Sequence, residues 1–208
     1  MLWSWINAVV DLVGQNPSWA LAVAFAAAII EAVAVLGILI PGTPILMAVA
    51  GAAAMAGQPM LPFLLLAILG AVIGDFVSFW VGQKYSRQLR LMWPFRTRPH
   101  LMLQADRFFQ RYGTLSVALC RFIPVLRSTV PLVAGMAGMQ RQRFIVANIL
   151  SAFVWAPVHV FPAQFAGLSL ERLQDGDWQT ATLWAAALAG CCAAGWVLHR
   201  RVVAVRAR

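Results

Sequence analysis

The stretch RYGTLSVALCRFIPVLRSTVPLVAGMAGM, residues 111–139, decides the fold of this chain. It is apolar enough to enter a membrane, yet Arg121 and Arg127 lie inside the apolar run. Pro124 and Pro131 interrupt the same run. A proline inside a helix removes a backbone hydrogen bond and clashes with the preceding turn. The stretch therefore predicts a broken helical hairpin rather than one spanning helix.

The composition of the whole chain indicates an integral membrane protein. Of its 208 residues, 62% are hydrophobic and 11% are charged, and the mean hydropathy is +0.77. No soluble domain of this size needs so much apolar surface. The net charge of +9 comes from Lys and Arg residues at the ends of apolar segments, so we expect no nucleic-acid partner. The three cysteines lack metal-ligand spacing, and we expect neither a metal nor a cofactor.

Charge and segment count predict the topology of a single membrane domain, residues 1–208, with its core at about 17–168 and a C-terminal transmembrane helix at about 178–199. The apolar segments run over residues 17–56, 62–82, 114–139, 144–168 and 178–198. The basic connector 84–111 and the basic C-terminal end are both expected to be cytoplasmic. Three segments separate them, although an even number of crossings is required. We therefore expect 114–139 to enter and leave on the same face, with both termini cytoplasmic.

The first half of the sequence predicts a similar re-entrant unit, which opens on the opposite face of the membrane. Residues 17–56 are too long for one span, and a Pro-Gly-Thr-Pro motif at 41–44 breaks them. If residues 21–36 cross outward, 38–56 can form a second re-entrant hairpin. The expected fold is an all-α membrane protein with two inverted repeats, each a re-entrant helical hairpin plus a spanning helix, with peripheral helices. In secondary transporters of this design the substrate site lies where hairpin tips meet. The expected tip residues are Pro41, Gly42, Thr43, Pro124, Pro131 and Gly135.

Two carboxylates, Glu31 and Asp75, lie inside apolar segments. A charge near the bilayer centre costs roughly 2.5–3.5 kcal/mol, so such a group must pair, change protonation state or line a wet cavity. Both are candidates for proton coupling. The alternatives are a cap or an arginine partner for Glu31, and a helix–helix hydrogen bond for Asp75. Asp75 adjoins a face of small residues that favours close helix packing. This face consists of Gly70, Gly74, Ser78 and Gly82.

The two arginines are the candidate substrate-binding residues. On one continuous helix, Arg121 and Arg127 would point in different directions, but a break at Pro124 allows both to face one cavity. A guanidinium group suits bidentate binding of a phosphate. The alternative is structural pairing with Glu31 and Asp75. The two are compatible if a phosphate replaces resting ion pairs.

His159 is a lone imidazole between Pro157 and Pro162, in a segment that these prolines are expected to break. A packed, hydrogen-bonded histidine is the favoured interpretation, and a proton relay is the alternative. The nearby Trp155 is expected to be an interfacial or core residue.

Together these motifs resemble the DedA family of bacterial inner-membrane proteins, which share a domain with eukaryotic VTT proteins involved in lipid scrambling. The resemblance covers roughly residues 31–167. It is carried by Glu31 ahead of Pro41-Gly42, by Gly74-Asp75 with Gly82, and by Arg121-Phe122-x-Pro124-x-x-Arg127 with Pro131, Ala134-Gly135 and Phe144. Many family members have an acid directly after Pro-Gly, where this chain has Thr43.

The resemblance implies a multi-pass carrier of the bacterial inner membrane. Members are implicated in membrane-potential maintenance and in returning undecaprenyl phosphate or phospholipid across the membrane, using the proton-motive force. By resemblance, Glu31 and Asp75 match the family's essential acids, and Arg121 and Arg127 its essential arginines. The implied partners are membrane lipids, an anionic lipid phosphate and protons, and a homo-oligomer is left open.

Three other functions remain open on the sequence. One is a proton-dependent ion or drug antiporter, and another is a membrane scaffold without transport. The third is a membrane enzyme such as a lipid phosphatase. That chemistry usually needs a nucleophile within reach of a base, and the chain shows no such pair and no acidic metal motif. We therefore expect a protein that is not an enzyme.

Overall fold

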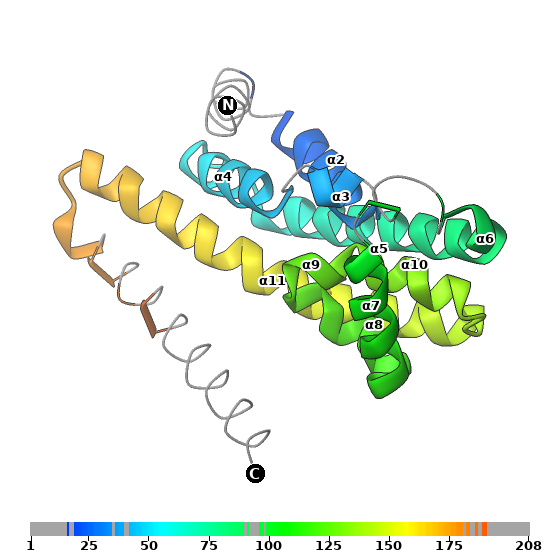
Figure 1. Cartoon of the computed structure of the whole chain (residues 1–208). Helices are drawn as coiled ribbons and strands as arrows, with labels where there is room; N and C mark the ends of the chain where they lie inside the picture. Colours follow the sequence, from blue (N-terminus) through cyan, green and yellow to red (C-terminus); the bar gives the residue numbers. More distant parts are fainter. Residues whose placement is uncertain are drawn as a thin grey trace, which may run out of the picture.

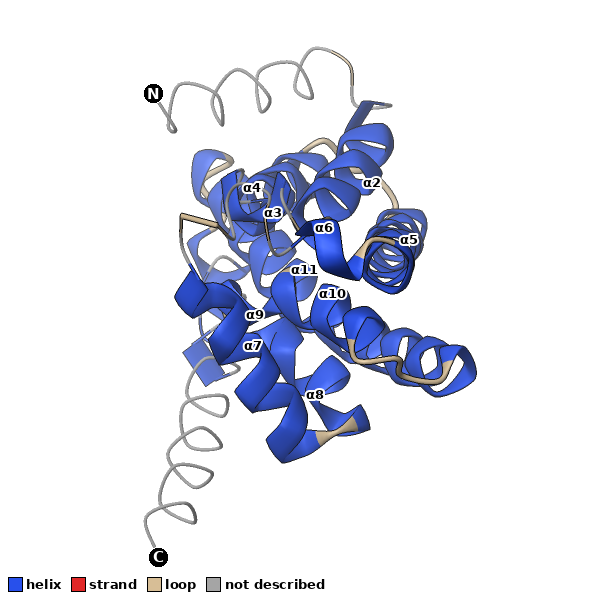
Figure 2. Cartoon of the chain, turned by 45° about the vertical axis from the view of Figure 1, so that its right-hand side comes forward, coloured by secondary structure: helices blue, strands red, loops and turns tan. Residues whose placement is uncertain are grey.

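The computed structural model of the chain describes residues 16, 19–34, 36–39, 42–89, 91, 96–97, 99–180, 182–183, 186 and 189–190. Over these residues every regular element is a helix, as the sequence predicts (Figures 1 and 2). The expectation for Pro41, and most of the C-terminal helix expected at 178–199, lie outside the described residues.

Short helices precede each of two long ones. The first group is α2 (Trp19–Ala32), α3 (Leu36–Leu39) and α4 (Gly42–Met55), followed by the long α5 (Met60–Lys84) and the short α6 (Ser86–Leu89). The second group is α7 (Pro99–Tyr112), α8 (Thr114–Leu119), the 3-10 helix η1 (Cys120–Phe122), α9 (Pro124–Arg127) and α10 (Thr129–Met136), followed by the long α11 (Arg141–Gln174).

The long helices α5 and α11 have the dimensions of membrane-crossing elements. They contain 25 and 34 residues. At 1.5 Å per residue, even α5 is about 37 Å long, which exceeds the hydrocarbon thickness of about 30 Å. Both helices are also apolar enough to cross a membrane. They contain the apolar segments 62–82 and 144–168 from which spans were predicted.

Helix α11 continues through Pro157 and Pro162, so the prediction that these prolines break the segment is wrong. An interior proline costs roughly 3 kcal/mol through a lost hydrogen bond and a clash. Close packing against α4 opposes this cost, because Gly51 lies against the backbone of Ala163 and Gly167. The ends of α4 and α11 therefore lie together, at the left of Figure 1.

Helix α4 is unbroken, so the prediction that residues 38–56 themselves form a hairpin is wrong. Pro44 lies in the first turn of α4, where its missing N–H breaks no helical hydrogen bond. The chain instead reverses its direction from α2 to α4, and these two helices pack against each other. Each has 14 residues, or about 21 Å, which is less than the thickness of a bilayer core.

Residues 114–139 are divided into α8, η1, α9 and α10, as the prolines in this stretch predict. Pro124 is the first residue of α9, and Pro131 lies in the first turn of α10. Both prolines therefore occupy positions where a helix tolerates a missing N–H. Because the helix is interrupted between α8 and α10, Arg121 lies in η1 and Arg127 lies in α9. The two side chains therefore leave the backbone from separate short helices.

Helix α5 is covered by α2 along its first half and by α10 along its second half. A Cβ on Gly70 would lie 2.6 Å from the carbonyl oxygen of Phe25, and one on Gly74 would lie 2.7 Å from another α2 carbonyl oxygen. Gly82 lies against the backbone of Leu132 in α10. Small residues thus let both short helices approach the backbone of α5.

Candidate functional site

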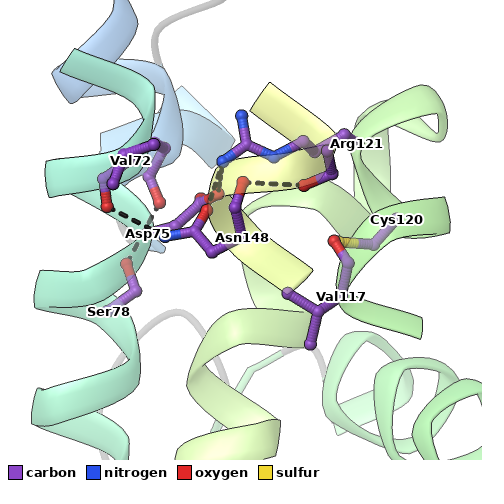
Figure 3. A network of polar contacts seen from close by, with 9 residues as sticks. Val72, Asp75, Ser78, Val117, Cys120, Arg121 and Asn148 are labelled. Carbon is purple, nitrogen blue, oxygen red and sulfur yellow. Dashed lines mark hydrogen bonds and ion pairs between the residues drawn. The ribbon is translucent and has the colours of Figure 1, made fainter. Parts of the chain in front are cut away.

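Arg121 forms a buried ion pair with Asp75. Its Nη2 lies 2.5 Å from Asp75 Oδ2, and both residues are 3% exposed. The same nitrogen donates to Oδ1 of Asn148 in α11 (Figure 3). Asn148 Nδ2 in turn donates to the carbonyl oxygen of Val72, 3.0 Å away. The guanidinium group is therefore held between α5 and α11.

Arg127 forms a second buried ion pair, with Glu31. Arg127 Nη1 lies 2.8 Å from Glu31 Oε1 and 3.0 Å from Thr43 Oγ1. The Thr43 hydroxyl donates to the same carboxylate oxygen. Glu31 also lies at the start of α4, because a Cβ on Gly42 would be 3.1 Å from Glu31 Oε2. The positive end of that helix favours a carboxylate at this position.

Both guanidinium groups lie against the ring of Trp155, which is fully buried in α11. The Cζ atom is 4.6 Å from the ring centroid for Arg127 and 6.0 Å for Arg121. Cations at these distances are attracted to the face of an indole ring. Trp155 thus brings together two ion pairs whose members come from α2, α5, η1 and α9. The formal charge of these four groups is zero, from two arginines and two acids.

Several polar atoms of this region have no hydrogen-bond partner in the part of the chain that is described. They are Glu31 Oε2, Arg121 Nε and Nη1, Ser128 Oγ and Trp155 Nε1. A buried polar group without a partner costs about 1–3 kcal/mol, and more when it is charged. Four of the five atoms can donate a hydrogen bond, as an anionic ligand requires.

A serine of α5 holds the end of α2, beside Glu31. Ser78 Oγ donates to the carbonyl oxygen of Ala32 and accepts from the Ala34 N–H, at 3.1 and 2.9 Å. It therefore satisfies backbone groups at the end of α2, directly after Glu31. Gly135, one of the expected hairpin-tip residues, lies in α10 against the backbone of Phe79 in α5.

Sequence reasoning did not single out Asn148, and it assigned Trp155 only to the core or the interface. The two residues are seven apart in α11, so they lie on the same helix face. An amide inside the apolar stretch 144–168 was the available signal for Asn148. His159 is a packed histidine: its Nδ1 lies 2.9 Å from the carbonyl oxygen of Trp155, and the two rings are 5.1 Å apart. The described residues contain no group of three or more potential His, Cys, Asp or Glu metal ligands.

In the part of the chain that the structure describes, two helices of membrane-crossing length and charged pairs buried among apolar side chains are features of a membrane protein. The model of the VTT domain matches residues 40–165. The chain belongs to this family, the DedA family of membrane proteins.

Curated relatives support the same assignment. The chain is 28% identical over 172 residues to the inner membrane protein YabI of Escherichia coli K12, covering 79% of this chain and 66% of YabI. It is 27% identical over 169 residues to the protein DedA of the same organism, covering 79% of this chain and 76% of DedA. An uncharacterized membrane protein of Mycobacterium tuberculosis is 32% identical over 133 residues, which cover 62% of this chain and 60% of the relative. The match spans slightly less than two thirds of the length of YabI. No solved structure matches the chain.

Proposed function

We propose that this protein moves the phosphate head group of a lipid, either undecaprenyl phosphate or a phospholipid, between the leaflets of the bacterial inner membrane. The observation that carries the proposal is the pair of buried arginines on one tryptophan ring. Two N–H-bearing nitrogens of Arg121 have no partner among the described residues, and a phosphate presents acceptor oxygens that match them. The acyl or prenyl tail would remain in the lipid while the head group passes.

The acids supply the coupling to protons. A phosphate that binds Arg121 and Arg127 competes with Asp75 and Glu31 for the same guanidinium groups. A carboxylate that loses its cation in an apolar site is an uncompensated buried charge, so it takes up a proton. When the phosphate leaves, the carboxyl group releases the proton and pairs with its arginine again. Protons taken up on one side and released on the other drive the cycle by the proton-motive force.

Two opposed re-entrant hairpins would give the head group access from both faces. In this proposal α2 and α4 form the first hairpin before α5, and the helices α8 to α10 form the second before α11. Both are built from helices shorter than a bilayer core, and the charged pairs lie beside their interruptions. Irregular backbone at membrane depth is tolerated where protein or water surrounds it. The first hairpin opens on the face where α5 begins and the second on the face where α11 begins, so the two units are related by inversion.

Transbilayer movement of a labelled lipid phosphate in proteoliposomes tests the proposal. The wild type is compared with Arg127→Ala and Glu31→Ala, and with Arg172→Ala, which changes an exposed arginine of α11. We expect at least a tenfold slower movement in the first two variants and no change in the third. Equal rates in all four proteins would reject the carrier. Proton or cation flux without lipid phosphate, abolished by Asp75→Ala, would instead identify an antiporter.

A further inference from the structure

Helix α7 has two unlike faces. Met102 and Ala105 are buried against the core around α10, with Phe109 packed beside them. Arg107 and Arg111, one helical turn apart, are exposed. Residues four apart share a helix face, so these two guanidinium groups are neighbours. Neither takes part in the ion pairs found among the described residues.

The two arginines border a groove between α7 and the segment that follows η1. Its volume is about 540 Å³, within the usual range of small-molecule sites. Phe108 and Tyr112 line one wall, with ring centroids 4.7 Å apart, and Ile123 and Leu126 line the other. None of the described residues that line it is acidic. The groove therefore combines positive charge at its edge with apolar walls.

We propose that this groove binds a lipid through its phosphate head group, as a second site distinct from the buried ion pairs. Arg107 and Arg111 bind the phosphate oxygens, for which guanidinium groups are well shaped. The aromatic and aliphatic walls hold the first part of the tail. A free phosphate would use only the arginines and leave these apolar walls exposed.

The groove shares a wall with the turn that carries Arg127. The carbonyl oxygen of Ile123 accepts hydrogen bonds from the N–H groups of Leu126 and Arg127, each at 3.0 Å. Leu126 lines the groove, while Arg127, the next residue, is buried against Trp155. The wall of the groove is therefore adjacent in the chain to Arg127 of the central site. A groove that passes its lipid on to the central site is a loading site. That role rests on the proposed function, whereas binding of the lipid in the groove does not.

Photolabelling tests the groove directly. The purified full chain, in nanodiscs of zwitterionic lipid, is irradiated with phosphatidic acid that carries a photoreactive group near the head, and labelled peptides are mapped by mass spectrometry. We expect labels in α7 and in residues 123–126. Arg107→Gln/Arg111→Gln should reduce them at least tenfold, while the matched control Arg87→Gln/Arg96→Gln, which changes exposed arginines outside the groove, should not. Ile123→Trp, which fills the groove and keeps both arginines, should reduce labelling as well.

Competition identifies the ligand. Unlabelled phosphatidic acid should displace the label, and diacylglycerol or inorganic phosphate should not. Displacement by diacylglycerol would show a site without phosphate recognition, and displacement by inorganic phosphate would show a site for the free anion. Either result overturns the proposal, as does labelling that is unchanged in Arg107→Gln/Arg111→Gln. Groove labelling in a protein that moves no lipid would keep this site and reject the carrier function.

Discussion

Each buried arginine comes from the second half of the chain and meets a carboxylate from the first half. Neither charge could stay at this depth alone, because the cost of an unpaired buried ion is several kcal/mol. The ion pairs therefore make the stability of each half of the chain depend on the other half. In the proposed function, the lipid phosphate competes with the two carboxylates for both arginines.

A double-mutant cycle on Arg121 and Asp75 measures this dependence. Removing one partner of a buried pair leaves the other uncompensated, so Arg121→Ala and Asp75→Ala should each lower the free energy of unfolding by about 3–5 kcal/mol. The double variant should lose clearly less than the sum of the two. Denaturant unfolding in mixed micelles gives the three values. Additive losses would mean that the pair contributes no coupling energy.

The contribution of the Trp155 indole N–H can be tested separately from that of the aromatic ring. Trp155→Phe keeps an aromatic face for both arginines and removes a donor that has no partner in the described structure. Because no hydrogen bond is lost, we expect destabilisation of about 1–2 kcal/mol from lost volume alone. Lipid-phosphate movement should fall about tenfold if the N–H donates to the phosphate. Wild-type movement in Trp155→Phe would show that only the ring matters, and Phe165→Leu is a control for aromatic loss elsewhere in α11.

At the scale of the helices, backbone approach sets the position of α10 on α5. Gly82 of α5 lies against the carbonyl group of Leu132, so any Cβ there would overlap with main-chain atoms that cannot rotate away. Gly82→Ala should therefore destabilise the protein by about 1–3 kcal/mol and slow transport, because α10 follows the turn that carries Arg127. Gly190→Ala is the matched control, since a Cβ at Gly190 would meet no atom of the described residues within 4 Å. Thermal unfolding of the two variants in detergent compares them, and equal midpoints would contradict the close contact.

The helices show which features a sequence can reveal. The breaks in residues 114–139 follow from proline chemistry, and α5 follows from an uninterrupted apolar run. The same proline rule failed at Pro157 and Pro162, because packing of α11 against Gly51 is a tertiary effect that local sequence does not encode. The position of the first reversal was missed because Pro44 looks like a break but lies in the first turn of α4.

The charged residues show the same limit at the site. Their presence in apolar stretches predicted that they would pair, and both pairs were considered in advance. Which arginine meets which acid depends on the packing of α2, α5 and α9, which spacing cannot give. Asn148 and Trp155 were missed as partners because a single amide or indole in an apolar helix has many packing roles.

At the scale of the whole molecule, contacts between helix ends determine which turns lie at the same end of the molecule. Gln83 Nε2 donates to the carbonyl oxygen of Met139 at 3.3 Å, so the turn before α11 lies beside the end of α5. The ends of α4 and α11 meet through Gly51 and Gly167. The turn after α4 and the turn after α11 therefore lie at the opposite end of the molecule (Figure 1).

Thiol accessibility tests this arrangement in a membrane. Single cysteines at Gln58, Gln140 and Asp175, in a background without the three native cysteines, are treated with a membrane-impermeant reagent in intact cells and in inverted vesicles. Because α5 and α11 each have the length to cross the bilayer, Gln58→Cys and Asp175→Cys should react from one side and Gln140→Cys from the other. The excess of basic residues between α5 and α8 predicts that Gln140→Cys reacts only in inverted vesicles. Reaction of all three cysteines from the same side would mean that α5 and α11 do not cross, and no head group could then be carried between two faces.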